Sequence, residues 1–446
     1  MNTTNTISSL MKRILNCLSE CNIQNYSLYE TTTKSEEAFF VKKDCTLTRN
    51  KMISECEVTI YHDFEISGIN YRGSSGFVAN PNMNEEELAA KLMSAYQSAS
   101  YVKNLYFPLP SGDRMASSDL SSEISSEISP AHHHTNTSLY RCKDLAGFIY
   151  KNDIFPDAFI NSLEIFVTET EIHIVNSNGV NVHFNDIIYS GEFIVQAKEP
   201  NDVELYQDFK YSYLDNDIAS SLFSLVLNNL QAVRDRANAV AINHFNDTEL
   251  SYQHIILQGN CVYELFMYYL RRLDASMIYP GYSHFKIGDS IISHQSLSDK
   301  INITLTPKLP YSSEGIQLFN LSLISDNTVN YITGDSRFSY YLGVPAIGSH
   351  QCYQLKNGNT SLNEIQTQPY LKIVNFSDFQ MDELTGQFGG EFRLAYYYDG
   401  KNVIPVTNGS ISGNINDVVS NMQLSSESQT SYYFNGPLAV SYPVKP

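Results

Sequence analysis

The sequence predicts an α+β protein with two domains: an α/β N-terminal domain of antiparallel strands and helices, and a larger β-rich C-terminal domain. Its 446 residues exceed one typical hydrophobic core, which favours two domains. Alternating polar and apolar runs are common along the chain, and Gly, Asn and Asp separate them, as in antiparallel sheets. With 42% hydrophobic and 17% charged residues, the composition is that of a globular protein.

The first hundred residues predict a helix, four strands and a second helix. The first helix covers residues 7–18, and the strands cover 24–31, 36–43, 56–66 and 67–79. Ser67-Gly68 is predicted to form the turn between the last two strands. Asn84 is predicted to cap the second helix, because three glutamates follow it and favour the positive end of the helix dipole.

Residues 111–138 are rich in Ser and Glu and predict a loop, since they have little apolar area to bury. His132, His133 and His134 lie within it. Adjacent histidines can trap a metal adventitiously, but a designed site needs ligands that converge from rigid elements. We therefore assign no metal site to them.

From residue 159 the pattern returns to strands, at 162–168, 171–176, 181–186 and 187–198. The turn Asn176–Gly179 joins the second and third of them. Pro200-Asn201-Asp202 interrupts the pattern, and a helix is predicted over 217–238. We place the domain boundary at this break, with an N-terminal domain of residues 1–200 and a C-terminal domain of residues 201–446.

We expect the stretch Leu384–Asn421 to form the central part of the C-terminal domain. Alternating runs at 391–398, 403–406 and 409–412 are separated by Asp399-Gly400 and Asn408-Gly409. Both dipeptides favour hairpins with type I′ turns, whose two central residues need φ > 0. A short helix is predicted next, with its apolar side made by Ile415, Val418, Val419 and Met422.

This order of elements resembles the TldD/PmbA (TldD/TldE) family. The resembling positions are Thr385-Gly386, Phe388, Gly390, Asp399-Gly400, Pro405-Val406, Ile411 and Gly413-Asn414. The turn Asn176–Gly179 resembles the family's N-S-x-G hairpin, and residues 308–316 and 339–343 resemble two further elements in part. The resemblance implies the fold of this family, an α/β N-terminal part and a larger β-rich C-terminal part of the TldD/PmbA type.

The resemblance also indicates what the chain lacks. TldD-type subunits are metallopeptidases with H-E-x-x-x-H on a helix, where two imidazoles bind zinc and the Glu is the general base. The corresponding stretch here, Ile255–Ala275, has a clear helical pattern but no histidine, and Glu264 is the only carboxylate within the helix. A late cysteine ligand is also missing, because no cysteine follows Cys352. The chain is therefore more similar to the PmbA/TldE type, which lacks the zinc motif and pairs with TldD-type subunits.

The sequence thus assigns no catalytic, metal or cofactor residue. Candidates for a substitute metal or nucleophile site are His350 and Cys352, because side chains two apart on a strand point the same way. We predict a non-catalytic PmbA/TldE-like subunit of a peptide-processing metallopeptidase, as a homodimer or as a heterodimer with a TldD-type zinc subunit. Two alternatives stay open: a divergent metallopeptidase with its own non-standard metal site, and a stand-alone protein that binds a peptide or small molecule.

Charge and cysteine content bear on partners and location. A formal net charge of −19 disfavours nucleic acid and anionic membranes, although family members are often labelled modulators of DNA gyrase. No apolar run approaches the length of a membrane span, and the N-terminus lacks a signal-peptide core. The seven cysteines form no C-x-x-C pair and read as small buried hydrophobes. We expect a cytoplasmic protein.

Overall fold

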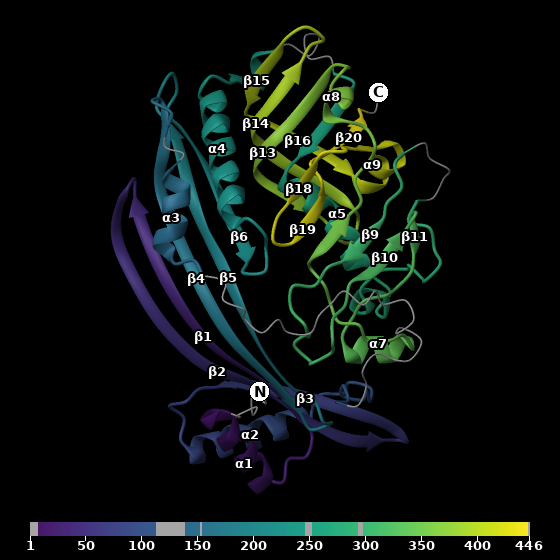
Figure 1. Ribbon diagram of the computed structural model, residues 1–446. Coiled ribbons are helices and arrows are strands. Elements are labelled where there is room, and N and C mark those ends of the chain that lie inside the picture. Colours follow the sequence, from purple (N-terminus) through teal and green to yellow (C-terminus); the bar gives the residue numbers. More distant parts are fainter. Residues whose placement is uncertain (1–7, 113–138, 152–153, 246–251, 293–297, 445–446) are drawn as a thin grey trace.

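The computed structural model describes residues 8–112, 139–151, 154–245, 252–292 and 298–444. It is a strand-rich α+β structure with one antiparallel sheet in the N-terminal part and two mixed sheets in the C-terminal part, as the sequence predicts at this level. Figure 1 shows the N-terminal sheet as a long curved layer beside the compact C-terminal sheets. The predicted loop 111–138, with His132, His133 and His134, lies almost wholly outside the described residues.

The N-terminal sheet has six antiparallel strands in the order β3-β2-β1-β4-β5-β6. Their bounds are β1 Tyr26–Val41, β2 Asp44–Ile66, β3 Ile69–Ala79, β4 Ala158–Asn176, β5 Asn181–Ala197 and β6 Val203–Ser212. The strands predicted at 24–31 and 36–43 are one strand, because β2 and β4 pair with the polar segment between them on both edges. The strands predicted at 162–168 and 171–176 are likewise both parts of β4. Those predicted at 181–186 and 187–198 are both parts of β5.

Four helices cover this sheet: α1 Ser9–Glu20, α2 Glu85–Ala99, α3 Cys142–Tyr150 and α4 Ile218–Ala237. The predicted turn is confirmed, since Ser67 and Gly68 both have positive φ, and Asn84 caps α2 in a capping box with Glu87. The helices bury their apolar sides in two cores, one under α1 and α2 and one under α3 and α4.

Residues beyond 200 continue the N-terminal sheet. β6 pairs with β5 along its whole length, and α4 packs its buried side chains into the core beneath α3. The boundary at residue 200 stays a prediction, and we propose that a division after α4 fits this packing better.

The C-terminal part contains two sheets around one large core. One has the order β11-β10-β9-β12-β19-β18, with β9 Ile303–Leu305, β10 Leu321–Ser325, β11 Thr328–Val329, β12 Tyr353–Leu355, β18 Ser428–Thr430 and β19 Phe434–Pro437. The other has the order β17-β20-β8-β13-β14-β15-β7, with β7 Val240–Ala241, β8 His254–Gln258, β13 Tyr370–Met381, β14 Gln387–Tyr398, β15 Val403–Thr407, β17 Gln423–Leu424 and β20 Ala439–Pro443.

Helices of the C-terminal part are α5 Asn260–Arg272, α6 Ala275–Ile278, α7 Ser336–Leu342, α8 Leu362–Ile365 and α9 Ile415–Asn421. The apolar side predicted for α9 is confirmed, because Ile415, Val418 and Val419 are buried there. In the part of the chain that the structure describes, no helix is both long and apolar enough to cross a membrane.

Of the two hairpins predicted after β14, the first is confirmed, because β15 pairs antiparallel with β14 across Asp399-Gly400, and the second is wrong. β16 Gly409–Asn414 pairs with β14 and not with β15, so Asn408-Gly409 is a bend between two strands that share one partner. Gly409 is needed there because a Cβ atom would lie 2.3 Å from the ring of Phe392. The turn at Asp399-Gly400 is also not type I′: Gly400 has positive φ and Asp399 does not, and the Asp399 carboxylate instead accepts backbone hydrogen bonds from Lys401 and Asn402.

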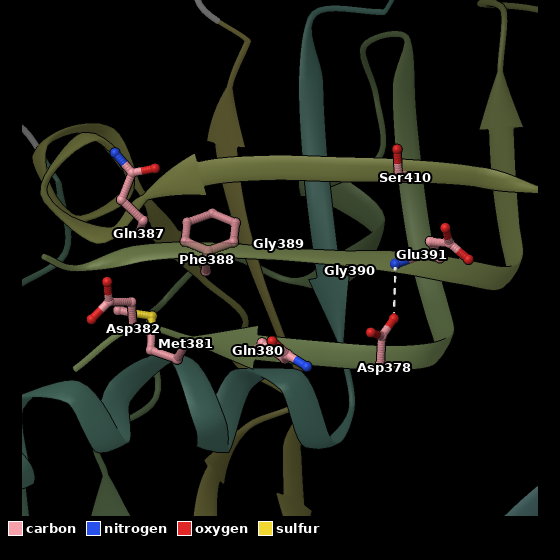
Figure 2. Close-up of a pocket in the computed structure, with 10 residues that line it drawn as sticks. All are labelled: Asp378, Gln380, Met381, Asp382, Gln387, Phe388, Gly389, Gly390, Glu391 and Ser410. Carbon is pink, nitrogen blue, oxygen red and sulfur yellow. Dashed lines mark hydrogen bonds between the residues drawn. The ribbon is translucent and has the colours of Figure 1, made fainter. Parts of the chain in front are cut away.

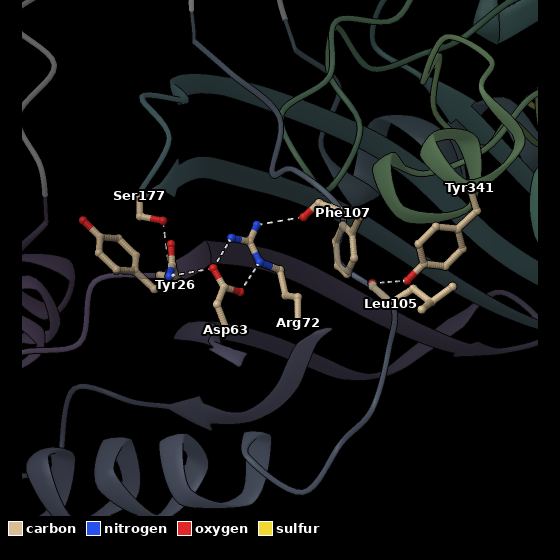
Figure 3. A network of polar contacts seen from close by, with 8 residues as sticks. Tyr26, Asp63, Arg72, Leu105, Phe107, Ser177 and Tyr341 are labelled. Carbon is tan, nitrogen blue, oxygen red and sulfur yellow. Dashed lines mark hydrogen bonds and ion pairs between the residues drawn. The ribbon is translucent and has the colours of Figure 1, made fainter. Parts of the chain in front are cut away.

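An arginine network joins the lower end of the N-terminal sheet to the C-terminal part (Figure 3). Arg72 on β3 is 5% exposed, and its Nε and second terminal nitrogen each lie 2.6 Å from a carboxylate oxygen of Asp63. A third donor of Arg72 reaches the carbonyl oxygen of Phe107 at 2.9 Å. The ring of Phe107 packs against Tyr341 of α7, whose hydroxyl donates to the carbonyl oxygen of Leu105. Arg72 thereby holds the segment 105–107, against which Tyr341 of α7 packs.

Candidate functional site

The helix that the resemblance links to zinc binding is α5, which follows β8 through Gly259 at φ 90°. Its predicted apolar side is confirmed, since Cys261, Val262, Leu265, Phe266, Tyr268, Tyr269 and Leu270 are buried. Tyr263, Glu264 and Met267 are only half-buried and form the side of the helix that leaves this core. These three side chains therefore decide what α5 can contribute to a site.

The late segment that the resemblance links to a cysteine ligand does meet α5. Tyr263 stacks on Tyr433, with ring centroids 5.9 Å apart, and on Tyr353 of β12 at 5.5 Å. The Tyr353 hydroxyl donates to the carbonyl oxygen of Tyr263 at 2.6 Å, and Phe434 packs against both rings. At the place where the family would hold a metal, this chain has a stack of aromatic rings.

Two lysines complete this arrangement. The Lys210 ammonium, from β6, donates to the Tyr433 hydroxyl at 2.8 Å and lies 4.2 Å from the ring centroid of Tyr432. The Lys308 ammonium lies 5.7 Å from the same ring and pairs with Asp215 at 2.7 Å. Such cation–π contacts stabilise an ammonium group that has lost water. We call the set Lys210, Tyr263, Lys308, Cys352, Tyr432 and Tyr433 the junction cluster, because it lies where the N-terminal sheet meets the C-terminal part.

The Cys352 thiol belongs to the junction cluster and stays protonated at neutral pH. Burial raises its pKa to about 11, although Lys308 and Lys210 act in the opposite direction. A protonated thiol is a poor nucleophile, since attack needs the thiolate. Cys352 therefore behaves as a buried apolar group, as do Cys17, Cys56, Cys142 and Cys261, whereas Cys45 is exposed.

His350 has different surroundings from Cys352. Its Nε2 atom lies 2.9 Å from the carbonyl oxygen of Ile347, burial lowers its pKa, and the nearest charge acting on it is Asp274. Neither residue lies on a strand, because β12 begins at Tyr353, so the argument that they share one face of a strand does not apply. Across the described ranges, no group of three or more His, Cys, Asp and Glu side chains is placed to hold a metal ion.

Glu264, at the position nearest to the family's general base, is not supported as one. Its Oε1 atom accepts a hydrogen bond from Asn260 at 2.8 Å. Burial raises its pKa, and Asp208 of β6 adds to this effect. A carboxylate beside another carboxylate could attract a cation, but its other neighbours in α5 are tyrosine and apolar side chains.

The family's zinc does not fit this arrangement. Zinc in proteins takes imidazole, thiolate or carboxylate ligands. The members of the junction cluster are instead tyrosines, one thiol and two ammonium groups, one of which is paired with Asp215, so the cluster contains at most one group of the kind that binds zinc. The cluster can exclude water and join two parts of the chain, but it holds no group that activates water.

Sequence reasoning located α5 and the late segment but missed the lysines. Lys210 and Tyr433 are 223 positions apart, and Lys210 is an ordinary residue of an alternating strand. Lys308 begins the segment 308–316 that resembles a family loop, and this was the one available indication. At the other end of that loop, Glu314 accepts hydrogen bonds from the backbone and hydroxyl of Ser336 at the start of α7.

Comparisons with known proteins agree with this arrangement. Residues 251–442 match the family model described as the PmbA/TldA metallopeptidase C-terminal domain. The fold is similar to that of TldE from Thermococcus kodakarensis, with a TM-score of 0.73 at 14% identity over 97% of this chain and 98% of that one. No curated protein matches the chain.

Two further structures are similar over almost their whole length. A proposed modulator of a DNA gyrase from Thermotoga maritima has a TM-score of 0.73 at 12% identity, covering 98% of this chain and 99% of that one. A proposed modulator of DNA gyrase from Bacteroides thetaiotaomicron has a TM-score of 0.72 at 14% identity, covering 98% of both. These identities establish a shared fold. Residues 251–442 thus match the PmbA/TldA family model, and the fold of the whole chain is similar to those of TldE and of the two proposed gyrase modulators.

Proposed function

We propose that the chain is a non-catalytic, cytoplasmic subunit of the PmbA/TldE type, which supports peptide processing by a TldD-type zinc subunit. The observation that carries this proposal is the junction cluster. Where α5 meets the late segment, tyrosine rings and two ammonium groups occupy the space in which zinc ligands would have to converge. The scaffold around that space keeps the family fold.

In this proposal the two subunits divide the work. The partner supplies zinc, which lowers the pKa of a bound water, and the general base that deprotonates it. This chain supplies a rigid surface. The stack of Tyr263, Tyr353 and Tyr433 closes the end of α5 to water, and Lys210 ties it to the N-terminal sheet. Pairing through the β-rich C-terminal part would place this surface beside the partner's metal.

The test is reconstitution with a TldD-type protein encoded in the same genome. The two chains are purified separately and together, and cleavage of an unstructured peptide is followed by mass spectrometry. We expect a stable complex that cleaves the peptide, and no cleavage by this chain alone. A partner variant lacking its general-base Glu is the control, and it should abolish cleavage while leaving the complex intact.

Chelator-sensitive cleavage by the isolated chain would overturn the proposal in favour of a divergent metallopeptidase. In that case the double substitution His350→Ala and Cys352→Ser should abolish cleavage. Failure of the two chains to associate, or association without any effect on cleavage, would also contradict the supporting role.

A further inference from the structure

Two adjoining hollows lie on the sheet formed by β13, β14 and β16, and Figure 2 shows the residues that line the first of them. One has a volume of about 450 Å³ and runs from Asp382 and Gln387 to Glu391. The other has a volume of about 390 Å³ and is lined by Arg236, Arg393 and Asn408, among others. Both are lined by Glu391 and Ser410, so they are adjacent, and we call the two hollows together the trough.

The strand register explains why the trough exists. Gln387, Gly389, Glu391 and Arg393 alternate along β14 with the buried Phe388 and Phe392, so they share the outer face. Gly389 lies between Gln380 of β13 and Ser412 of β16, and Glu391 between Asp378 and Ser410. A glycine and two serines leave the middle of this face low, while longer polar side chains rise around it.

One end of the trough holds two arginines. Arg236 is half-buried at the end of α4, where it donates to the carbonyl oxygen of Glu204, and Arg393 is exposed on β14. Burial and the neighbouring Arg393 charge lower the pKa of Arg236, so the two guanidinium groups repel each other. Neither forms an ion pair with a carboxylate of the described residues. Among the other described arginines, five form such an ion pair (Arg49, Arg72, Arg141, Arg234 and Arg271) and three do not (Arg13, Arg272 and Arg337).

What distinguishes Arg236 and Arg393 is that two arginines without an ion pair line one hollow. Two guanidinium groups at one hollow are the arrangement that proteins use to hold a carboxylate, because each can donate two parallel hydrogen bonds. Asn408 and Ser410 line the same hollow and add neutral hydrogen-bonding groups. The charge at this end of the trough is therefore complementary to a small anion.

The rest of the trough has the opposite charge. Asp378, Asp382 and Glu391 line it, and the Asp382 carboxylate is engaged by the turn that leads to Thr385. From Gln387 to Arg393 an extended strand covers roughly 20 Å, at about 3.4 Å per residue. An extended peptide of five or six residues has this length, a carboxylate at one end and, where it contains lysine, positive charge along it.

We propose that this trough binds the C-terminal segment of an extended peptide, with the terminal carboxylate between Arg236 and Arg393 and a basic side chain beside Asp378 and Glu391. Glu391 lies next to the arginines and disfavours more highly charged anions such as phosphate. The inference rests on the proposed function only in that both expect a peptide ligand. It needs neither zinc nor the partner subunit.

Calorimetric titration of the isolated, untagged chain tests the inference. The probe is the acetylated pentapeptide Ala-Ala-Lys-Ala-Ala, compared as the free acid and as the C-terminal amide. We expect the free acid to bind about tenfold more tightly than the amide, because hydrogen bonds to a charged group are lost in the amide. Arg393→Gln should weaken binding of the free acid by about the same factor and abolish the difference between the two peptides.

Two matched variants sharpen the result. Arg234→Gln removes the same charge from the same helical turn as Arg236, but Arg234 pairs with Asp157 outside the trough, so it should bind like the wild type. Glu391→Gln removes the acid nearest the arginines and should tighten binding of a plain acetyl-penta-alanine acid, the lysine-free peptide. If the site recognised only the positive charge of the peptide, Glu391→Gln would instead weaken binding of the lysine peptide. The free acid and the C-terminal amide would then bind equally tightly.

Several outcomes would overturn the inference. These are equal binding of acid and amide, no binding of either, or binding of inorganic phosphate that the peptide cannot displace. If the wild-type chain self-associated and Arg393→Gln abolished this self-association, the trough would be an interface between copies of the chain. The proposed function can fail separately, since the partner can fail to associate while the isolated chain still distinguishes acid from amide.

Discussion

The N-terminal part contacts the C-terminal part at several places, and two of these contacts use a basic side chain against aromatic rings. At the lower contact, Arg72 lies 4.6 Å from the ring centroid of Tyr106, and the adjacent Phe107 packs on Tyr341. At the upper contact, Lys210 lies over Tyr432 and donates to Tyr433. The two contacts consist of similar residues, but they differ in whether the basic side chain has a carboxylate partner.

Arg72 is neutralised by two hydrogen bonds to Asp63, whereas Lys210 forms no ion pair with a described carboxylate. A buried cation with a carboxylate partner is part of the structural framework, and removing one partner leaves an uncompensated charge. A cation held only by rings and a hydroxyl contributes less to stability, and it repels other cations. We infer that the lower contact stabilises the fold and that the upper contact determines which ligands the site can accept.

The largest expected effect is at the lower contact. Arg72→Met removes two hydrogen bonds to the Asp63 carboxylate, which is 36% exposed and keeps its bond from Asn25. It also removes the Arg72 donor to the Phe107 carbonyl oxygen, so we expect a loss of about 2 kcal/mol in the free energy of unfolding. Urea denaturation measures it. Arg141→Met is the control, because its pair with Glu36 is exposed and should cost less than about 1 kcal/mol. Equal losses in the two variants would remove the distinction between buried and exposed pairs.

A second test concerns Glu37, another buried charge with partners. Burial acts to raise its pKa, but hydrogen bonds from Lys51, Arg49 and Ser35 outweigh it and lower the pKa to about 2. The lowered pKa contributes stability that is complete above the unfolded value of 4.5 and is lost as the pH falls toward 2. The wild type should therefore lose stability more steeply than Glu37→Gln over this range. Parallel pH profiles from thermal denaturation would contradict the assignment.

The smallest effect is expected at the upper contact. Lys210→Met keeps the apolar stem against Tyr432 and removes a charge without a carboxylate partner, so the free energy of unfolding should change by less than about 1 kcal/mol. Urea denaturation alongside Arg72→Met gives a direct comparison. A loss as large as that of Arg72→Met would show that Lys210 is part of the framework and would break the contrast between the two contacts.

Much of the fold could be predicted because its determinants are local. The Ser67-Gly68 turn, the Asn84 cap and the apolar side of α5 each depend on residues within a few positions. The prediction failed where pairing overrides local pattern. The polar run Thr31–Ser35 belongs to β1 because the two neighbouring strands pair with it. β16 pairs with β14, where Phe392 packs against Gly409.

The site could be predicted only in part for the same reason. The sequence alone shows that α5 has no histidine and that the late segment contains tyrosines. The position of Lys210 between them depends on how β6 approaches the C-terminal part, and no residue pattern within β6 reports that distance. The arginines at the trough, Arg236 and Arg393, are likewise far apart in the sequence and meet only in the fold.

The most direct test of the central claim, that this chain is a non-catalytic subunit, is elemental analysis of the purified, untagged protein. The protein is dialysed briefly against a chelator, supplied with zinc again, and freed of unbound metal. We predict no stoichiometric zinc, because the described residues bring no group of three or more His, Cys, Asp and Glu side chains together to hold it. A stoichiometric amount of tightly held zinc would contradict the claim and direct attention to His350 and Cys352.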